Sequence, residues 1–95
     1  MPAYIIARVD VKDAEQYAKY RAATPAAVAA FGGKFVVRGG EMETLEGPEE
    51  NRRVVVLEFE SMERAREFYN SELYQAAIAL RKPASEAQFI LLDGL

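Results

Sequence analysis

The amino-acid sequence predicts an α+β fold in which helices cover one face of a four-stranded antiparallel sheet. Segments rich in β-branched and aromatic residues indicate strands at 4–11, 35–38 (continuing at 41–45), 53–59 and 88–93. The two longer segments between them repeat apolar residues at three- and four-residue spacing, which is typical of amphipathic helices. The element order is therefore βαββαβ. Because crossover connections are right-handed, we expect both helices on the same face, as in the ferredoxin-like arrangement.

The first helix has a clear start, a clear end and an interruption. Asp13 can accept hydrogen bonds from the free N–H groups of the first turn. Positions on one stripe then face inward: Tyr17, Tyr20, Thr24, Val28 and Phe31. Pro25 has no N–H for the helical ladder, so we expect a kink or two short abutting helices, with Thr24 as the second N-cap. Gly32 and Gly33 supply a left-handed stop.

Two residue pairs and one proline interrupt or end the predicted elements after position 38. Gly39 and Gly40 follow Arg38 directly, and we expect them to form a β-bulge that bends the sheet before the strand resumes at 41–45. Asn70 and Ser71 interrupt the helix that Ser61 begins, which indicates a re-capped second helical segment. Pro83 closes that segment.

Composition excludes several classes of function. The chain has 95 residues, enough for a single domain over 1–95, and a net charge of −3, which disfavours nucleic-acid binding. It has no histidine and no cysteine, so we expect no metal, no cofactor and no histidine-based catalysis. No apolar stretch approaches the roughly 20 residues that span a bilayer, and the first residues do not resemble a signal peptide. We expect a cytoplasmic protein without membrane contact.

Both faces of the sheet are expected to be apolar, although helices can cover only one. Alternate side chains of a strand point to opposite faces. In the first strand, Tyr4, Ile6 and Arg8 point to one face, and Ile5, Ala7 and Val9 to the other. In the second strand, Val36 and Arg38 point to one face, and Phe35 and Val37 to the other. A soluble monomer rarely exposes so large an apolar patch. We therefore expect a homodimer that packs through the helix-free sheet face.

Several segments are similar to a known family: RVDVKDAEQYAKYRAATPAAVAAFGGKFVVRGG, RRVVVLEFES, FYNSELYQAAIALR and the terminal ILLDG. They resemble the small bacterial family catalogued as domain of unknown function 1330, with VRGG and Y-x-S-x-x-Y-Q as the most specific parts. The resemblance implies the dimeric α/β-barrel fold, in which two ferredoxin-like sheets face one another. That superfamily also holds cofactor-independent monooxygenases, muconolactone-type isomerases and haem-dependent enzymes. Asn70 departs from the family pattern, in which histidine is common at that position.

Two arginines and one glutamate are candidates for a ligand site. The guanidinium of Arg38, beside two glycines, could clamp a carboxylate or an enolate. Alternatively, Arg38 pairs with an internal acid such as Glu58 or Asp10 and fixes the strand register. Arg8 has the same two interpretations, since it could join Arg38 in an anion site or form a salt bridge with Glu58.

The remaining candidates lie on the helices. Tyrosines occupy or adjoin the inward stripes, at Tyr17, Tyr20, Tyr69 and Tyr74. Their hydroxyls could orient or protonate a substrate oxygen, or the rings could simply belong to the core. Asn70 and Ser71 could point into the same pocket, or serve only to end one helix and cap the next.

Two functions follow from these alternatives. The first is a homodimer that binds a small anionic or oxygen-bearing molecule between helices and sheet, with cofactor-free proton-transfer or monooxygenase-type chemistry by analogy of fold. The second is a non-catalytic structural or stress-related dimeric module with a structural Arg–Glu interior. RNA binding is disfavoured because the strand at 53–59 carries aliphatic side chains where stacking aromatics would be needed.

Overall fold

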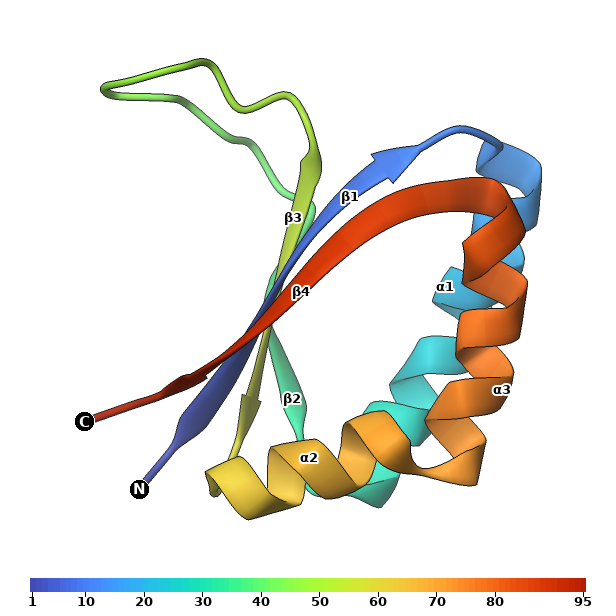
Figure 1. Ribbon diagram of the computed structural model, residues 1–95, viewed down its shortest axis with the longest axis vertical. Helices are drawn as coiled ribbons and strands as arrows, with labels where there is room; N and C mark the ends of the chain where they lie inside the picture. Colours follow the sequence, from blue (N-terminus) through green and yellow to red (C-terminus); the bar gives the residue numbers. More distant parts are fainter.

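The computed structural model describes residues 1–95, which form an α+β fold. Its elements are β1 (Ala3–Val11), α1 (Ala14–Ala30), β2 (Lys34–Arg38), β3 (Arg53–Phe59), α2 (Met62–Asn70), α3 (Glu72–Arg81), a 3₁₀ turn (Lys82–Ala84) and β4 (Ser85–Asp93). The four strands form one antiparallel sheet in the order β2-β3-β1-β4. The helices lie together on one side of this sheet, with α1 packed against α3 (Figure 1). These features confirm the ferredoxin-like fold that the sequence predicts.

The central strand β1 shows the expected alternation between the two faces of the sheet. Ala3, Ile5, Ala7 and Val9 are buried on the face that the helices cover, while the residues between them are only half-buried. On the helix-free face, Ile6 lies between Val56 of β3 and Ile90 of β4 in the register of the sheet.

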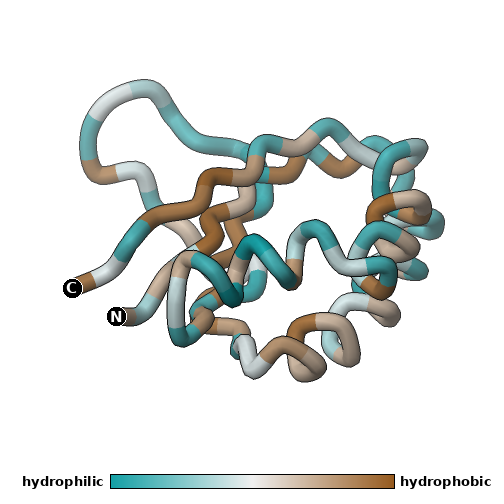
Figure 2. The backbone as a smooth tube through the Cα atoms, turned by 60° about the horizontal axis from the view of Figure 1, so that its bottom comes forward, coloured by the Kyte–Doolittle hydropathy of each residue, from teal (hydrophilic) through white to brown (hydrophobic).

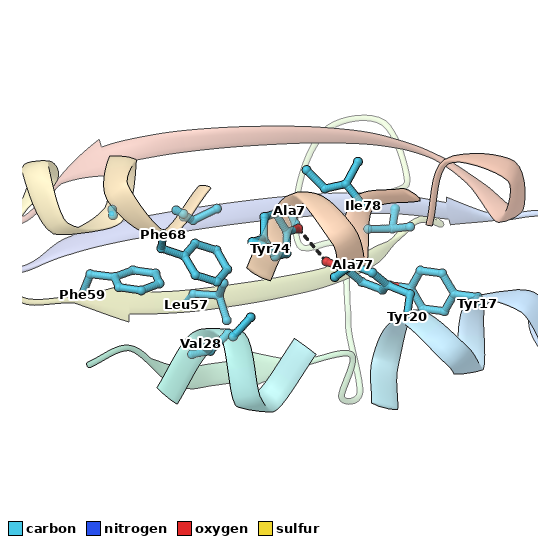
Figure 3. Packing of buried hydrophobic residues seen from close by; sticks show 14 of the residues in the cluster. Ala7, Tyr17, Tyr20, Val28, Leu57, Phe59, Phe68, Tyr74, Ala77 and Ile78 are labelled. Atoms are coloured by element: carbon cyan, nitrogen blue, oxygen red, sulfur yellow. Dashed lines mark hydrogen bonds between the residues drawn. The ribbon is translucent and has the colours of Figure 1, made fainter. Parts of the chain in front are cut away.

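An aromatic cluster joins the helices to the helix-covered face of the sheet. The ring of Phe68 lies 4.9 Å from that of Phe59 and 4.4 Å from that of Tyr74, measured between centroids. All three side chains are buried, and Figure 3 shows them in one layer close to Leu57. Burying each ring stabilises the fold by about 1.5–3 kcal/mol, so this cluster contributes a large part of the packing energy.

Helix α1 runs through Pro25 as one continuous helix, so the predicted division into two abutting helices with Thr24 as N-cap is wrong. The side chain of Asp13 caps the start by accepting a hydrogen bond from Gln16 N. The hydroxyl of Thr24 points back and donates to the carbonyl oxygen of Tyr20. Pro25 leaves the carbonyl of Arg21 without its helical donor, and Arg38 Nη2 donates to that oxygen at 2.9 Å instead.

Strand β2 contains the β-bulge earlier than the sequence predicts. The register with β3 shifts between Phe35 and Val37, not at Gly39 and Gly40. Because side-chain direction alternates at every residue, the extra residue moves the side chains that follow it to the opposite face of the sheet. As a result Phe35 and Arg38 share the helix-covered face, whereas the alternation in the sequence predicts opposite faces for them.

The predicted strand at 41–45 is also wrong, because residues 39–52 form a loop without strand structure. Gly39 has a φ of +65°, which turns the chain out of the sheet after its N–H has paired with Val54 O. The loop projects to the side of the sheet away from the helices (Figure 1) and is largely hydrophilic (Figure 2). Leu45 is an exception within it, with 88% of its surface exposed.

The break between α2 and α3 follows the prediction. Ser71 ends α2 with its N–H bonded to Phe68 O, and its hydroxyl accepts from Tyr74 N at the start of α3. Neither these helices nor α1 has the length and apolar character needed to cross a membrane.

The contact between Arg38 and the helix predicts a dependence on Pro25. Arg38→Met should lower the free energy of unfolding by roughly 1 kcal/mol, because the Arg21 carbonyl loses its donor. In a Pro25→Ala background the same substitution should leave the free energy of unfolding nearly unchanged, because the N–H of the new alanine can donate to the Arg21 carbonyl. Urea denaturation of the four proteins in this double-mutant cycle measures the coupling. Equal costs in both backgrounds would show that Arg38 stabilises the fold in another way.

Candidate functional site

A small cavity lies between α1 and the helix-covered face of the sheet, and we call it the helix-side cavity. Its volume is about 20 Å³, room for a water-sized group, before any movement of its walls. Aromatic rings form much of its lining: Tyr17, Tyr20, Phe35 and Phe89. Arg38 and Arg53 reach it from the sheet and Arg21 from the helix. The cavity therefore combines apolar walls with cationic groups.

Arg38 lies at the edge of this cavity and contacts no carboxylate. Its guanidinium is 4.3 Å from the ring centroid of Phe35 and donates to the carbonyl oxygen of Arg21. Neither Glu58 nor Asp10 pairs with it, so the predicted structural ion pair does not form: Glu58 pairs with Lys34 on the other face of the sheet.

Arg53 occupies the space beside the glycine that follows Arg38. The guanidinium of Arg53 fills the space that a Cβ on Gly39 would enter, and the φ of +65° at Gly39 favours glycine there. Arg53 Nη2 lies 3.5 Å from Arg38 O, and its guanidinium carbon is 6.0 Å from the ring centroid of Tyr17. The Nε of Arg53 is buried and has no hydrogen-bond partner.

Arg81 is a buried cation at the back of the same region. Only 6% of the residue is exposed, and its Nε has no hydrogen-bond partner. Its guanidinium carbon lies 4.6 Å from the ring centroid of Phe89 and 5.7 Å from that of Tyr20, two of the rings that line the cavity. A buried charge normally has a counter-ion, because transferring it out of water is costly.

No acid neutralises these three arginines, Arg38, Arg53 and Arg81, which we call the arginine cluster. The ion pairs of the structure involve other cations: Arg8 and Arg52 with Glu50, Lys12 with Asp10, Lys34 with Glu58, and Arg64 with Glu67. The chain has 15 acidic residues against 12 basic ones, so the lack of partners does not reflect a shortage of carboxylates. The helix side of the sheet is locally cationic.

Two tyrosines connect the cavity to the core through their hydroxyls. Tyr20 Oη and Tyr74 Oη are 2.7 Å apart, with Tyr20 in the cavity wall and Tyr74 fully buried behind it (Figure 3). Burial raises the pKa of both hydroxyls above the ordinary tyrosine value, and the nearby positive charge of Arg81 opposes this rise. Both residues are therefore neutral at physiological pH.

Arg8 and Glu58 lie on the helix-free face and do not join this site. Arg8 Nε is 3.5 Å from Glu50 Oε1, Arg8 Nη1 is 3.5 Å from Gln88 Oε1, and Arg8 forms no pair with Glu58. The guanidinium of Arg52 holds the pKa of Glu50 down to about 2. The sequence could not predict these contacts, because they depend on how loop 39–52 returns to the sheet.

The other helix candidates belong to a second, more open groove of about 280 Å³ between α2 and β4. Tyr69 and Asn70 line it together with Arg66, and only Phe89 borders both this groove and the helix-side cavity. The amide of Asn70 donates to Arg66 O. Ser71 is occupied as the cap between the two helices.

The sequence prediction missed Arg53 and Arg81, although both carry a signal. Arg53 is in phase with Val55 and Leu57, on the side of β3 that the helices cover. Arg81 follows Tyr74 and Ile78 at helical spacing, so it lies on the buried stripe of α3. Arg81 is in the last turn of α3, where a cation is common, but its position on the buried stripe indicates a charge inside the protein.

Comparison with known proteins identifies the family. The sequence matches the family described as "Domain of unknown function (DUF1330)" over residues 2–95. The chain belongs to this family. None of the curated proteins matches it.

Solved structures share the fold. RPA0582 of Rhodopseudomonas palustris, a protein of unknown function, is 25% identical with a TM-score of 0.78, covering 99% of this chain and 82% of its own. SnoaB of Streptomyces nogalater, described as a cofactor-independent oxygenase, is 16% identical with a TM-score of 0.71, covering 99% and 93%. A protein of Thermobifida fusca described as dimeric and ferredoxin-like is 18% identical with a TM-score of 0.68, covering 99% and 92%.

Proposed function

We propose that this chain binds a small carboxylate, or another oxygen-bearing organic anion, in the helix-side cavity. The observation that carries the proposal is the arginine cluster: three guanidinium groups lie at or behind one cavity, and none has a carboxylate partner. Hydrogen bonds between guanidinium and carboxylate are short, strong and directional. Arg38 is exposed to water, so a bound anion would chiefly supply the counter-charge that the half-buried Arg53 and the buried Arg81 lack.

The walls of the cavity limit the ligand. A volume of about 20 Å³ admits only a water-sized group, so even a carboxylate needs α1 to move away from the sheet. Aromatic rings favour a flat or apolar body next to the charged head.

Cofactor-free proton transfer is the reaction class that we propose for this site. Tyr20 lines the cavity, and a positioned tyrosine hydroxyl can exchange a proton with a substrate oxygen, whereas the hydroxyl of Thr24 already donates to Tyr20 O. The fold that this chain shares with SnoaB, whose description is "cofactor-independent oxygenase", is compatible with such chemistry.

We further propose that a second copy covers the helix-free face of the sheet. This face carries aliphatic side chains without cover, among them Val37 and Leu92, which are 41% and 45% exposed. Val56, Ile6 and Ile90 follow Val37 across the sheet register, and Leu92 lies two residues beyond Ile90 on β4. Structural neighbours described as dimeric support this arrangement.

Titration with acetate tests the proposed binding site. In ¹H–¹⁵N NMR spectra at constant ionic strength, acetate should cause saturable shifts at residues around the helix-side cavity, and neutral acetamide should not. Arg53→Met should weaken acetate binding on the order of tenfold, which corresponds to about 1.4 kcal/mol. Arg64→Met is the matched control, because Arg64 already pairs with Glu67 outside the cavity. Equal effects of the two substitutions, or no saturable shifts, would overturn the proposal.

A further inference from the structure

We propose that Tyr20 donates its hydroxyl proton to the ligand in the helix-side cavity, and that Tyr74 is a positioning residue that fixes the direction of this proton. The inference rests on the proposed function, since it concerns the same cavity. It adds the requirement that the bound group presents an acceptor oxygen to Tyr20.

The geometry of the two hydroxyls is asymmetric. Their oxygens are 2.7 Å apart, so one of them donates to the other. Tyr20 lines the cavity, whereas Tyr74 is 0% exposed and does not reach it. Apart from Tyr20 Oη, no group of the protein forms a hydrogen bond with Tyr74 Oη. In Figure 3 the dashed line joins the two hydroxyls, which extend toward one another from α1 and α3.

A count of protons decides which tyrosine is the donor. If Tyr20 donated, the proton of Tyr74 would remain buried without an acceptor, at a cost of about 1–3 kcal/mol. If Tyr74 donates, its proton is satisfied and Tyr20 keeps its own proton for the cavity. The second arrangement leaves no buried donor unpaired. Tyr74 therefore donates to Tyr20, and Tyr20, which lines the cavity, keeps a proton that a ligand there can accept.

The buried guanidinium of Arg81 strengthens Tyr20 as a donor. It lies 5.7 Å from the centroid of the Tyr20 ring and has no acid to neutralise it. A positive charge at this distance stabilises any negative charge that develops on the tyrosine oxygen when its proton is shared. The hydrogen bond received from Tyr74 acts in the same direction.

These contacts define the class of ligand. Arg38 and Arg53 supply only donors, and Tyr20 adds another donor at the wall. A carboxylate, an enolate or a ketone adjoining a carboxylate presents acceptor oxygens to all of them. A ligand whose polar groups are donors only, such as an amine, would leave these groups unpaired.

The direction of the hydrogen bond can be tested without a ligand. In wild-type protein with ¹³C-labelled tyrosine, a hydroxyl proton protected from solvent exchange should couple to Cζ of Tyr74 and disappear in Tyr74→Phe. A protected proton that couples to Cζ of Tyr20, or rapid exchange of both hydroxyl protons, would overturn the assignment.

Acetate titrations then test the contact with a ligand. Tyr20→Phe should weaken acetate binding by roughly tenfold and Tyr74→Phe by roughly two- to fivefold, as expected for a direct and an indirect hydrogen-bond loss. Tyr69→Phe should have no effect, because Tyr69 lies in the separate groove. Equal acetate affinity in wild type and Tyr20→Phe overturns the contact and leaves the arginine site standing. Failure of wild type to bind acetate overturns the proposed function itself.

Discussion

If the proposed homodimer forms through the helix-free face, Ile6→Asp should convert it into a folded monomer. Ile6 lies at the middle of the helix-free face, between Val56 and Ile90 in the sheet register. A two-fold interface contains each residue twice. Because Ile6 is already half-buried in one copy, losing two isoleucine side chains should weaken association by about 1.5–3 kcal/mol, or roughly 10- to 10²-fold, before the cost of burying two carboxylates is counted.

Sedimentation velocity at micromolar concentration measures this change. Wild type should sediment as a dimer and Ile6→Asp as a monomer with an unchanged far-ultraviolet circular dichroism spectrum. Ala18→Asp is the matched control, because Ala18 is exposed on α1 at the opposite side of the molecule. A monomeric wild type, or a dimer that tolerates aspartate at position 6, would contradict the proposed interface.

Arg81→Met should raise the free energy of unfolding by roughly 1–3 kcal/mol. Arg81 is almost completely removed from solvent, and no carboxylate compensates its charge. Replacing buried charges with apolar side chains of similar volume is often stabilising. Methionine retains contact with the rings of Tyr20 and Phe89 while removing the charge.

The same substitution should weaken acetate binding, because it removes positive charge behind the cavity. Urea denaturation, with the slope of the transition checked for constancy, measures the stability. Arg64→Met provides the comparison, since that arginine is partly exposed and paired, and its loss should lower stability slightly. If Arg81→Met lowered stability by more than the control does, the guanidinium would be part of the structural framework instead of an unpaired cation kept for binding.

Sequence patterns predicted the fold well where local rules and tertiary packing agree. Asp13, Ser61 and Ser71 each accept a hydrogen bond from an N–H in the first turn of the helix that follows. The strands are marked by β-branched residues, and the alternation in β1 matches its burial. These features depend on neighbours within a few residues, which is why one sequence is enough to find them.

The candidate site was only partly predictable, because its geometry depends on two non-local features. The bulge at Val36 moves Arg38 to the helix-covered face, where it serves the carbonyl freed by Pro25. Loop 39–52 brings Glu50 to Arg8, and no local pattern in the sequence indicates this pairing. Tyr20 and Tyr74 were recognised as inward tyrosines, but their pairing requires the packing of α1 on α3.

The central claim is that the arginine cluster binds an organic anion in the helix-side cavity. A crystal structure determined at high resolution after soaking in acetate tests it most directly. The account predicts planar density in the cavity, within hydrogen-bond distance of Arg53 and of the hydroxyl of Tyr20. Acetate bound elsewhere on the molecule, with only water beside these two residues, would contradict it.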